Sequence, residues 1–261
     1  MIFPKKIQDL IQNAGYVSDE VGMSGSTILI FDEMILKMSP LSEESEQEYQ
    51  VMKWLDGRLP VPKIIEFEQD ESMSYLLMTK LPGQMACFEK HLSDPLALTS
   101  QLAQGLRMLW SIDISDCPFS YSIDKRLQTA KYNVENDLVD LDAADPDTFG
   151  AKGFKDPKEL YHWLMENKPE TEPVFGHGDY CLENIFIDQQ GISGFIDLGK
   201  SGIADKWQDI ALCYRSLRYE FDEAFSDRRH DHYHPELLFE KLGIEPDWHK
   251  IRYYMLVDEL F

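Results

Sequence analysis

The chain has 261 residues, a length that fits one large domain or two modest ones. Hydrophobic residues make up 43% of it and aromatic residues 12%, which excludes wholesale disorder because a real core can be buried. With 47 acidic and 25 basic side chains, the formal net charge is −22. This charge argues against binding of nucleic acid or anionic membrane through a general basic surface. It is compatible with a cationic partner, or with solubility alone.

Neither a membrane span nor a secretion signal is predicted. No apolar run approaches the roughly 20 residues that a span needs, and the first residues alternate charge with Ile and Leu at helical spacing. The four cysteines are scattered and form no C-x-x-C pair: Cys87, Cys117, Cys181 and Cys213. We therefore expect a cytoplasmic protein with reduced thiols, without a disulfide framework or a zinc site.

The first 80 residues are predicted to be rich in strands, because short apolar runs alternate with turn residues. These strands are expected over 16–21, 26–31, 34–38, 64–68 and 74–79. A helix is predicted over 43–56, ended by Gly57. The sequence Lys-Leu-Pro-Gly at 80–83 breaks the strand pattern and is the natural hinge between two lobes.

Beyond the hinge, apolar residues recur at three- and four-residue spacing, which predicts helices. They are expected over 92–112, 125–141, 156–167, 205–219, 235–242 and 247–260. One short β segment, over 184–187 and 193–196, interrupts them. The sequence thus predicts an α+β fold with a small β-rich lobe over residues 1–80 and a larger, mainly helical lobe over residues 81–261.

Three polar residues occupy turn or strand-end positions in otherwise apolar segments. Asp179 and Asn184 lie in the stretch HGDYCLEN, and Asp197 lies in FIDLG. An unpaired charge at Asp197 costs several kcal/mol, and a divalent cation is the simplest partner. Because magnesium prefers oxygen ligands, Asn184 and Asp197 are candidate metal ligands, which leaves Asp179 to act on a hydroxyl. Turn capping is the alternative for each residue taken alone.

This ordered set resembles the catalytic and metal loops of the aminoglycoside phosphotransferases, which are relatives of the protein kinases. The likeness points to the 3′-phosphotransferase (kanamycin kinase) branch and covers essentially the whole chain. The further segments that carry it are LPVPK at 59–63, SIDISDCP at 111–118, SGFIDLG at 193–199, ADKW at 204–207 and DELF at 258–261. The resemblance implies a protein-kinase-like fold with two lobes.

Lys37 and Glu48 fit the same family. Lys37 lies in an apolar strand, where an outward-pointing edge lysine is the alternative. Glu48 precedes Val51, Met52 and Leu55 at helical spacing, so it lies on the apolar face of its helix and needs a cation. The two residues resemble the lysine–glutamate pair that orients nucleotide phosphates in kinase-like enzymes.

The resemblance also implies nucleotide contacts by a loop and by the hinge. Met23 and Ser24, in a loop with two glycines, are expected at the phosphates, and backbone groups of Thr79 and Leu81 at the adenine edge. Ile35, two residues before the lysine, takes a position where the branch can have an aromatic residue that stacks on the base. The choice between ATP and GTP therefore stays open.

The end of the sequence is acidic, with Asp258, Glu259 and the carboxylate of Phe261 in four residues, where a helix dipole disfavours acids. Exposed tails tolerate such charge; the resemblance implies instead that these groups bind ammonium groups of the substrate. Asp145 and Asp147 either add to this acidic wall or simply solvate a loop. Two further positions match basic family sites: Arg215, and Lys200 where arginine is common.

Two other interpretations are weaker. Residues 194–201 match the P-loop pattern GxxxxGKS, but the intervening residues resemble a strand and no apolar strand precedes them. The second is a binding module without enzymatic activity on the same fold, which would have lost the metal ligands or the base. The five polar residues that the chemistry needs are all present: Lys37, Glu48, Asp179, Asn184 and Asp197.

We therefore expect a phosphotransferase that uses Mg²⁺ and ATP or GTP to phosphorylate a hydroxyl of a cationic small molecule. The resemblance favours the 3′-hydroxyl of an aminoglycoside antibiotic, which confers resistance. No nucleic acid, membrane or obligate protein partner is implied. The alternative keeps the fold but changes the acceptor to a macrolide or an amino-alcohol metabolite.

Overall fold

The computed structural model describes residues 3–12, 14–19, 25–151, 153–228, 230 and 233–261. The chain divides into two compact units. The first unit consists of Met1–Met85 and Asn184–Lys200, and the second consists of Ala86–Glu183 and Ser201–Phe261. This division differs from the lobes expected from the sequence, which placed the boundary at residue 80 and the whole of 184–200 in the helical lobe.

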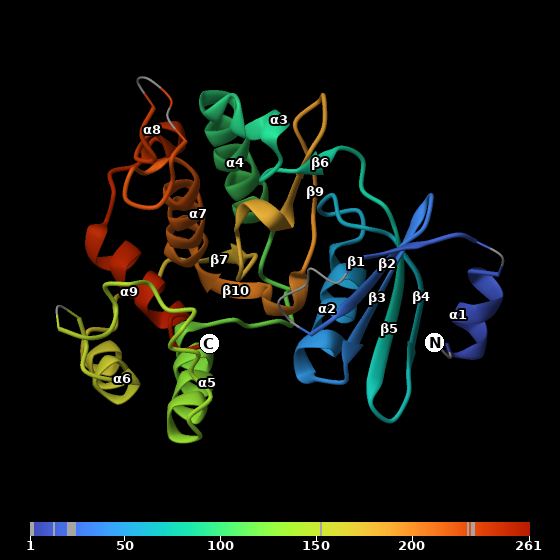
Figure 1. Cartoon of the computed structure of the whole chain (residues 1–261), viewed down its shortest axis with the longest axis horizontal. Coiled ribbons are helices and arrows are strands. Elements are labelled where there is room, and N and C mark those ends of the chain that lie inside the picture. Colours follow the sequence, from blue (N-terminus) through green and yellow to red (C-terminus); the bar gives the residue numbers. More distant parts are fainter. Residues whose placement is uncertain (1–2, 13, 20–24, 152, 229, 231–232) are drawn as a thin grey trace. The chain divides into compact units, whose positions relative to one another are not determined.

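A five-stranded antiparallel sheet forms most of the first unit (Figure 1). Its strands, in spatial order, are β1 (Val17–Asp19), β2 (Thr27–Ile30), β3 (Met34–Pro40), β5 (Met73–Thr79) and β4 (Ile64–Gln69). On β3, Leu36 pairs with Leu29 of β2 and Leu77 of β5, and all three are fully buried. Ile7 of the helix α1 (Lys5–Leu10) packs into the same core.

Helix α2 (Glu43–Leu55) follows β3 and begins at a reciprocal cap. The Ser42 hydroxyl accepts from the Ser45 N–H, and the Ser45 hydroxyl accepts from the Ser42 N–H, both at 3.1 Å. Acidic residues in the first turn also suit the positive end of the helix dipole. The cap fixes where the helix starts, and therefore which residues face the sheet.

A second, three-stranded sheet of the first unit contains β6 (Gln84–Met85), β8 (Ile185–Ile187) and β9 (Ile192–Phe195). The Phe195 N–H donates to the Pro60 carbonyl at 3.0 Å, and the Ser193 hydroxyl donates to the Pro82 carbonyl at 2.6 Å. The 3₁₀ turn η2 (Leu198–Lys200) then packs against α2. These bonds explain why the 184–200 segment belongs to the first unit.

No helix begins at Lys200. The strand β10 (Gly202–Asp205) follows η2 instead, and helix α7 starts only at Lys206. A P-loop requires a helix at its lysine, so the P-loop match is a coincidence of sequence.

The second unit is mainly helical (Figure 1). Its helices are α3 (Glu89–Leu92), α4 (Pro95–Trp110), α5 (Ile123–Glu135), α6 (Pro157–Glu166), α7 (Lys206–Phe221), α8 (Leu237–Leu242) and α9 (Trp248–Asp258). Helix α7 packs against α9, and α4 packs against α8. Side-chain oxygens cap the longer helices, as Asp94 does for α4 and Ser122 for α5. Among the described residues no helix has both the length and the apolar character of a membrane span.

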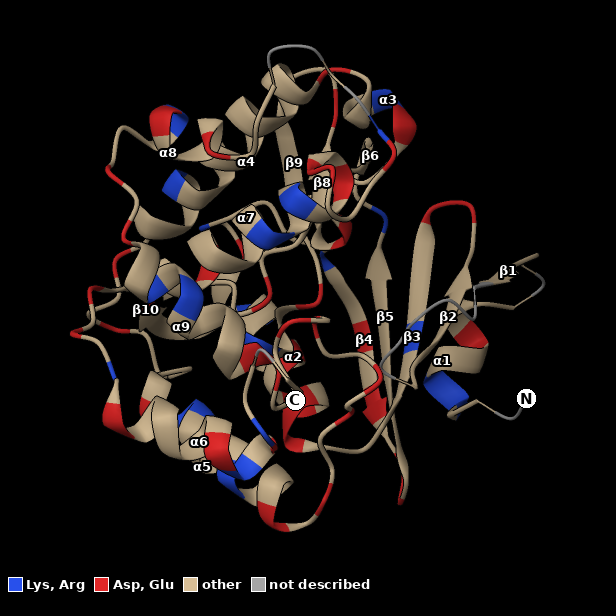
Figure 2. Ribbon diagram, turned by 60° about the vertical axis from the view of Figure 1, so that its left-hand side comes forward, with Lys and Arg blue, Asp and Glu red and all other residues tan. Residues whose placement is uncertain are grey.

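Helix α3 and both strands of this unit were not predicted, and helix α5 is shorter than expected. Strand β7 (Pro173–Gly176) pairs antiparallel with β10. It could not be recognised from the sequence, because an apolar run of four residues has no distinctive periodicity. Helix α5 ends at Glu135 and not at 141, because Asp137 adopts a left-handed conformation with φ 54°. Residues after 136 therefore form a loop. The ribbon in Figure 2 shows acidic positions along both units, interspersed with fewer basic ones.

Replacing Gly83 by alanine is expected to destabilise the first unit. Gly83 has φ +87°, and a Cβ there would lie 2.2 Å from the carbonyl oxygen of Ile187 on β8. Both backbone strain and a clash with main-chain atoms follow, so urea unfolding should show a loss of about 3 kcal/mol. Gly57→Ala is the matched control, because Gly57 has φ +75° with no atom within 4 Å and should lose only about 1 kcal/mol. Equal losses would mean that the contact with Ile187 is unimportant.

Candidate active site

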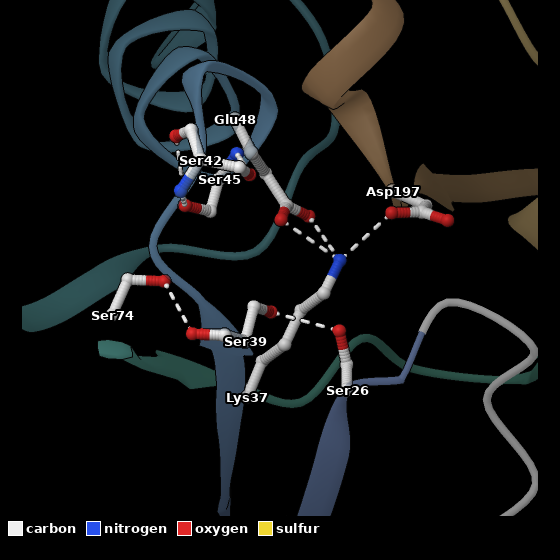
Figure 3. Close-up of polar contacts among 8 residues, drawn as sticks. All are labelled: Ser26, Lys37, Ser39, Ser42, Ser45, Glu48, Ser74 and Asp197. Carbon is white, nitrogen blue, oxygen red and sulfur yellow. Dashed lines mark hydrogen bonds and ion pairs between the residues drawn. The ribbon is translucent and has the colours of Figure 1, made fainter. Parts of the chain in front are cut away.

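The ammonium group of Lys37 lies between two carboxylates of the first unit (Figure 3). Its Nζ is 3.0 Å from Oε1 and 2.8 Å from Oε2 of Glu48, and 2.7 Å from Oδ1 of Asp197. The side chains of Lys37 and Glu48 are 13% and 7% exposed, whereas that of Asp197 is 40% exposed. We call Lys37, Glu48 and Asp197 the ion trio. Its first two members form the pair expected from the sequence.

Three elements bring the ion trio together. On β3, Lys37 alternates with the buried Leu36, so the two side chains lie on opposite faces of the sheet. Glu48 lies on the buried face of α2, one turn before Val51. Asp197 follows β9 in a left-handed conformation with φ 60°. Such a conformation is uncommon for a residue with a side chain and is concentrated at functional sites.

Burial and charge oppose each other in the ion trio. Burial by itself lowers the pKa of Lys37, but Glu48 and Asp197 more than offset it, so this pKa lies above its ordinary value. Burial raises the pKa of Glu48, and Lys37 offsets part of that rise. Removing one partner of such a pair leaves a buried charge and costs about 3–5 kcal/mol. The lysine is therefore held charged, in a form suited to phosphate oxygens.

The two candidate metal ligands lie at the same end of the β8–β9 hairpin. The Ile196 N–H donates to the Asn184 carbonyl at 3.0 Å, which places Asn184 opposite the residue before Asp197. Asn184 is buried and Asp197 is partly exposed. Among the described residues no group of three or more His, Cys, Asp and Glu is arranged to hold a metal. Two oxygen donors suit a magnesium ion that takes its other ligands from phosphates and water.

The structure describes only some of the residues for which the resemblance implies nucleotide contacts. Met23 and Ser24 lie outside the described residues. Ser26, just after that loop, shares a hydrogen bond of 2.8 Å with Ser39 of β3, two residues beyond Lys37 (Figure 3). This bond fixes the described end of the loop to the lysine strand.

At the hinge, Thr79 is engaged within the first unit. Its N–H donates to the Lys63 carbonyl at 2.9 Å, and its hydroxyl accepts from the Lys63 N–H at 3.0 Å. The side chain of Leu81 lies against Gly194 of β9, so close that a Cβ there would be 2.4 Å from a Leu81 methyl. Contact of Thr79 and Leu81 with adenine stays a prediction.

In the second unit, the loop that carries Asp179 is fixed by buried side chains. Asp209 of α7 accepts from the N–H groups of His177 at 2.6 Å and Gly178 at 2.9 Å. The Ser201 hydroxyl donates to the His177 carbonyl at 2.7 Å, and Gln208 Nε2 donates to the Gly178 carbonyl at 3.2 Å. Burial raises the pKa of Asp209, which is 1% exposed.

Sequence reasoning missed this support of the Asp179 loop. A signal was present: Asp209 precedes the apolar run Ile210, Ala211 and Leu212 on a helix, as Glu48 precedes the apolar residues of α2. The side chain of His177 also holds this loop, since its Nδ1 accepts from the Asp179 N–H at 3.3 Å.

The acidic residues at the end of α9 are not free of cations. Asp258 accepts from Arg126 of α5 at 2.8 Å and from Arg215 of α7 at 2.5 Å. Glu259 Oε1 lies 3.9 Å from Arg215, and its Oε2 accepts from the Asp145 N–H at 2.8 Å. The structure therefore brings four of the expected substrate residues together and adds Arg126, which the sequence did not suggest.

The remaining candidates differ in their surroundings. The Tyr219 hydroxyl donates to the Asp145 carboxylate, so this part of the 136–156 loop is tied to α7 as well as to Glu259. Asp147 is exposed. Phe261 is 37% exposed, and its ring lies 5.0 Å from the Arg126 guanidinium. Lys200 ends η2 in the first unit and is partly buried.

Comparison with known proteins gives consistent matches along the chain. The family model described as "Phosphotransferase enzyme family" matches residues 18–254. An aminoglycoside 3′-phosphotransferase of Enterococcus faecalis is 42% identical, over 98% of this chain and 97% of that protein. One of Staphylococcus aureus is 41% identical, over the same shares of the two chains.

Solved structures agree with these matches. The crystal structure of an aminoglycoside-3′-phosphotransferase of type VIII has a TM-score of 0.82 at 26% identity, and covers 98% of this chain and 97% of that one. An aminoglycoside phosphotransferase from Streptomyces rimosus, in complex with ADP and streptomycin, has a TM-score of 0.77 at 23% identity, with coverages of 97% and 95%. The resemblance and the α+β kinase-like fold inferred from the sequence are confirmed.

The Glu259 carboxyl is expected to make stability depend on pH. Burial raises its pKa from 4.5 to about 7, so between these values the folded protein binds a proton that the unfolded chain has released. Its contribution to stability is complete at low pH and is lost as pH rises through 7. The free energy of unfolding of wild type relative to Glu259→Gln should fall by about 1 kcal/mol between about pH 4.5 and 7.5. Glu245→Gln, at an exposed position, is the control, and a flat difference for Glu259→Gln would contradict the assignment.

Proposed function

The chain belongs to the phosphotransferase enzyme family, and on that premise we propose that it transfers the γ-phosphate of ATP or GTP to the 3′-hydroxyl of an aminoglycoside. Modification of the antibiotic in this way confers resistance. The observation that carries the proposal is the ion trio: a buried lysine held by a helix glutamate and by the aspartate of the FIDLG segment. Relatives that cover the whole chain, named aminoglycoside 3′-phosphotransferases, support this acceptor.

In the first unit, Lys37 binds the nucleotide phosphates. Glu48 fixes the direction of the lysine from the buried side, whereas the side chain of Asp197 is partly exposed and accessible to a cation. Asn184 and Asp197 would hold Mg²⁺, which neutralises charge on the phosphates when bound. Because the transition state of phosphoryl transfer is loose, positioning and charge neutralisation provide most of the catalysis.

In the second unit, Asp179 acts on the acceptor. A bond forms between the acceptor oxygen and the γ-phosphorus while the bond from that phosphorus to the bridging oxygen breaks. The nucleoside diphosphate leaves with the bridging electron pair, and the hydroxyl proton passes late to the Asp179 carboxylate. The bonds from Asp209, Ser201 and Gln208 fix the backbone just before Asp179, so the base is positioned in advance.

Acidic groups of the second unit select the acceptor. Asp145, Asp258 and Glu259 form one cluster, with Arg215 within it. Ammonium groups of an aminoglycoside would add charged donors to the carboxylates of this cluster, which a neutral sugar cannot supply. Asp147, Lys200 and the carboxylate of Phe261 complete the set of acceptor contacts implied by the family resemblance.

Purified protein should consume nucleotide with aminoglycosides in the presence of Mg²⁺, and much less with macrolides or plain amino-alcohols.

Asp179→Ala should lower kcat by about 10²–10⁴-fold and leave the Kd for ATP unchanged, because the base makes no nucleotide contact. Asp188→Ala, in the β8–β9 turn, is the matched control. Full turnover by Asp179→Ala would remove it as the base, and turnover with macrolides or amino-alcohols alone would identify the alternative acceptor.

The metal assignment makes a separate prediction. Asp197→Asn keeps the shape of the side chain but removes the charge that a divalent cation needs, so half-maximal activity should require at least about tenfold more Mg²⁺. The Mg²⁺ dependence of ATP binding, measured by calorimetry, gives the same comparison without turnover. Glu68→Gln, which removes a carboxylate of β4 paired with Lys6, is the control. An unchanged Mg²⁺ requirement in Asp197→Asn would refute the assignment.

A further inference from the structure

Arg126 of α5 is an unusual buried charge. Its side chain is 1% exposed, and its guanidinium lies 5.5 Å from the ring of Tyr121 and 5.0 Å from that of Phe261. One nitrogen, Nη2, donates to Asp258 Oδ1 at 2.8 Å. Nε and Nη1 have no hydrogen-bond partner among the described residues. Burial of a guanidinium with a single end-on partner is a poor contribution to stability, so stability alone does not explain this arginine.

Its partner Asp258 is held from two sides. Arg126 binds Oδ1, and Arg215 of α7 binds Oδ2 at 2.5 Å. A carboxylate has about four lone-pair directions, and the Asp258 side chain is still 25% exposed. Two arginines from two helices therefore fix the rotation of the carboxylate and leave it able to accept a further hydrogen bond.

Helix α5 makes a second, separate bond to the same end of the chain. Asn133 Nδ2 donates to the Leu260 carbonyl at 2.9 Å. Asn133 lies seven residues after Arg126, which places both on one face of α5. Of these two bonds, only the one from Arg126 reaches an acidic side chain. Asn133 thus provides a control that holds the backbone of this segment without touching Asp258.

We propose that Arg126 is a positioning residue for the cationic acceptor, acting through Asp258; the proposal rests on the proposed function. With Arg126 present, Asp258 cannot turn fully onto Arg215, so the carboxylate keeps an orientation in which it can also accept from an ammonium group. Without Arg126, Arg215 can take both oxygens in a bidentate pair, and the carboxylate is withdrawn from the acceptor. Because Arg215 remains, Asp258 is not left as an uncompensated charge, and the fold survives the substitution.

A double-mutant cycle between Arg126 and Asp258 tests this, with kanamycin as the acceptor. Arg126→Met should raise the KM for kanamycin about fivefold, with kcat and the KM for ATP changed by less than about twofold. In an Asp258→Asn background the same substitution should have no further effect on KM. Arg126→Lys keeps a charged donor, so its KM for kanamycin should lie between those of wild type and Arg126→Met. It replaces Arg126→Met in the cycle if the methionine variant does not fold.

Asn133→Ala is the matched control and should leave the KM for kanamycin within about twofold of wild type, whatever its effect on thermal stability. An unchanged or lower KM in Arg126→Met and Arg126→Lys, an equal rise in the Asp258→Asn background, or an equal rise in Asn133→Ala overturns the role of Arg126 alone. A wild-type enzyme that phosphorylates another cationic acceptor but no aminoglycoside overturns the proposed function, and the cycle is then run with that acceptor. Phosphorylation of neutral acceptors only overturns both proposals.

Discussion

The structure of the first unit depends on the charge of one lysine. Lys37 emerges from a sheet whose opposite face is the core, and a buried ammonium group is tolerated only with a charged partner. Glu48 supplies that partner from α2, and Asp197 supplies a second one from the end of β9. The sheet, the helix and the 184–200 segment therefore meet at Lys37 Nζ, the group to which the proposed function assigns the nucleotide phosphates.

The second unit follows the same physical rule with other residues. Asp209 is buried because it satisfies two backbone N–H groups of the Asp179 loop, and its own cost of burial is offset by those bonds. Arg126 and Arg215 offset the charge of Asp258. The end of α9 is therefore much less negative than its sequence suggests. Selection of a cationic acceptor would then depend on how the carboxylates of the protein are oriented as well as on how many there are.

Sequence patterns predicted burial well where a charged residue occupies a position on the apolar face of a helix. Glu48 was placed on the inner face of its helix by the residues three, four and seven positions later, and this is where it lies. The same reasoning predicts that Asp209 is buried on α7, but it does not identify the loop that Asp209 supports. It could not have found Arg126, because nothing in the spacing of α5 shows that its buried face meets an acid 132 residues away. Strand β7 was not predicted because a run of four residues is too short to show a periodicity.

By itself the sequence determined the α+β class, most helix and strand positions, the Lys37–Glu48 pair and the family to which the loops belong, because these depend on local periodicity and on short motifs. Tertiary structure decided that residues 184–200 pack with the first unit, that Asp197 joins Lys37 across 160 positions, and that two arginines hold Asp258. Periodicity shows which face of an element is buried, but only the folded chain shows what that face meets.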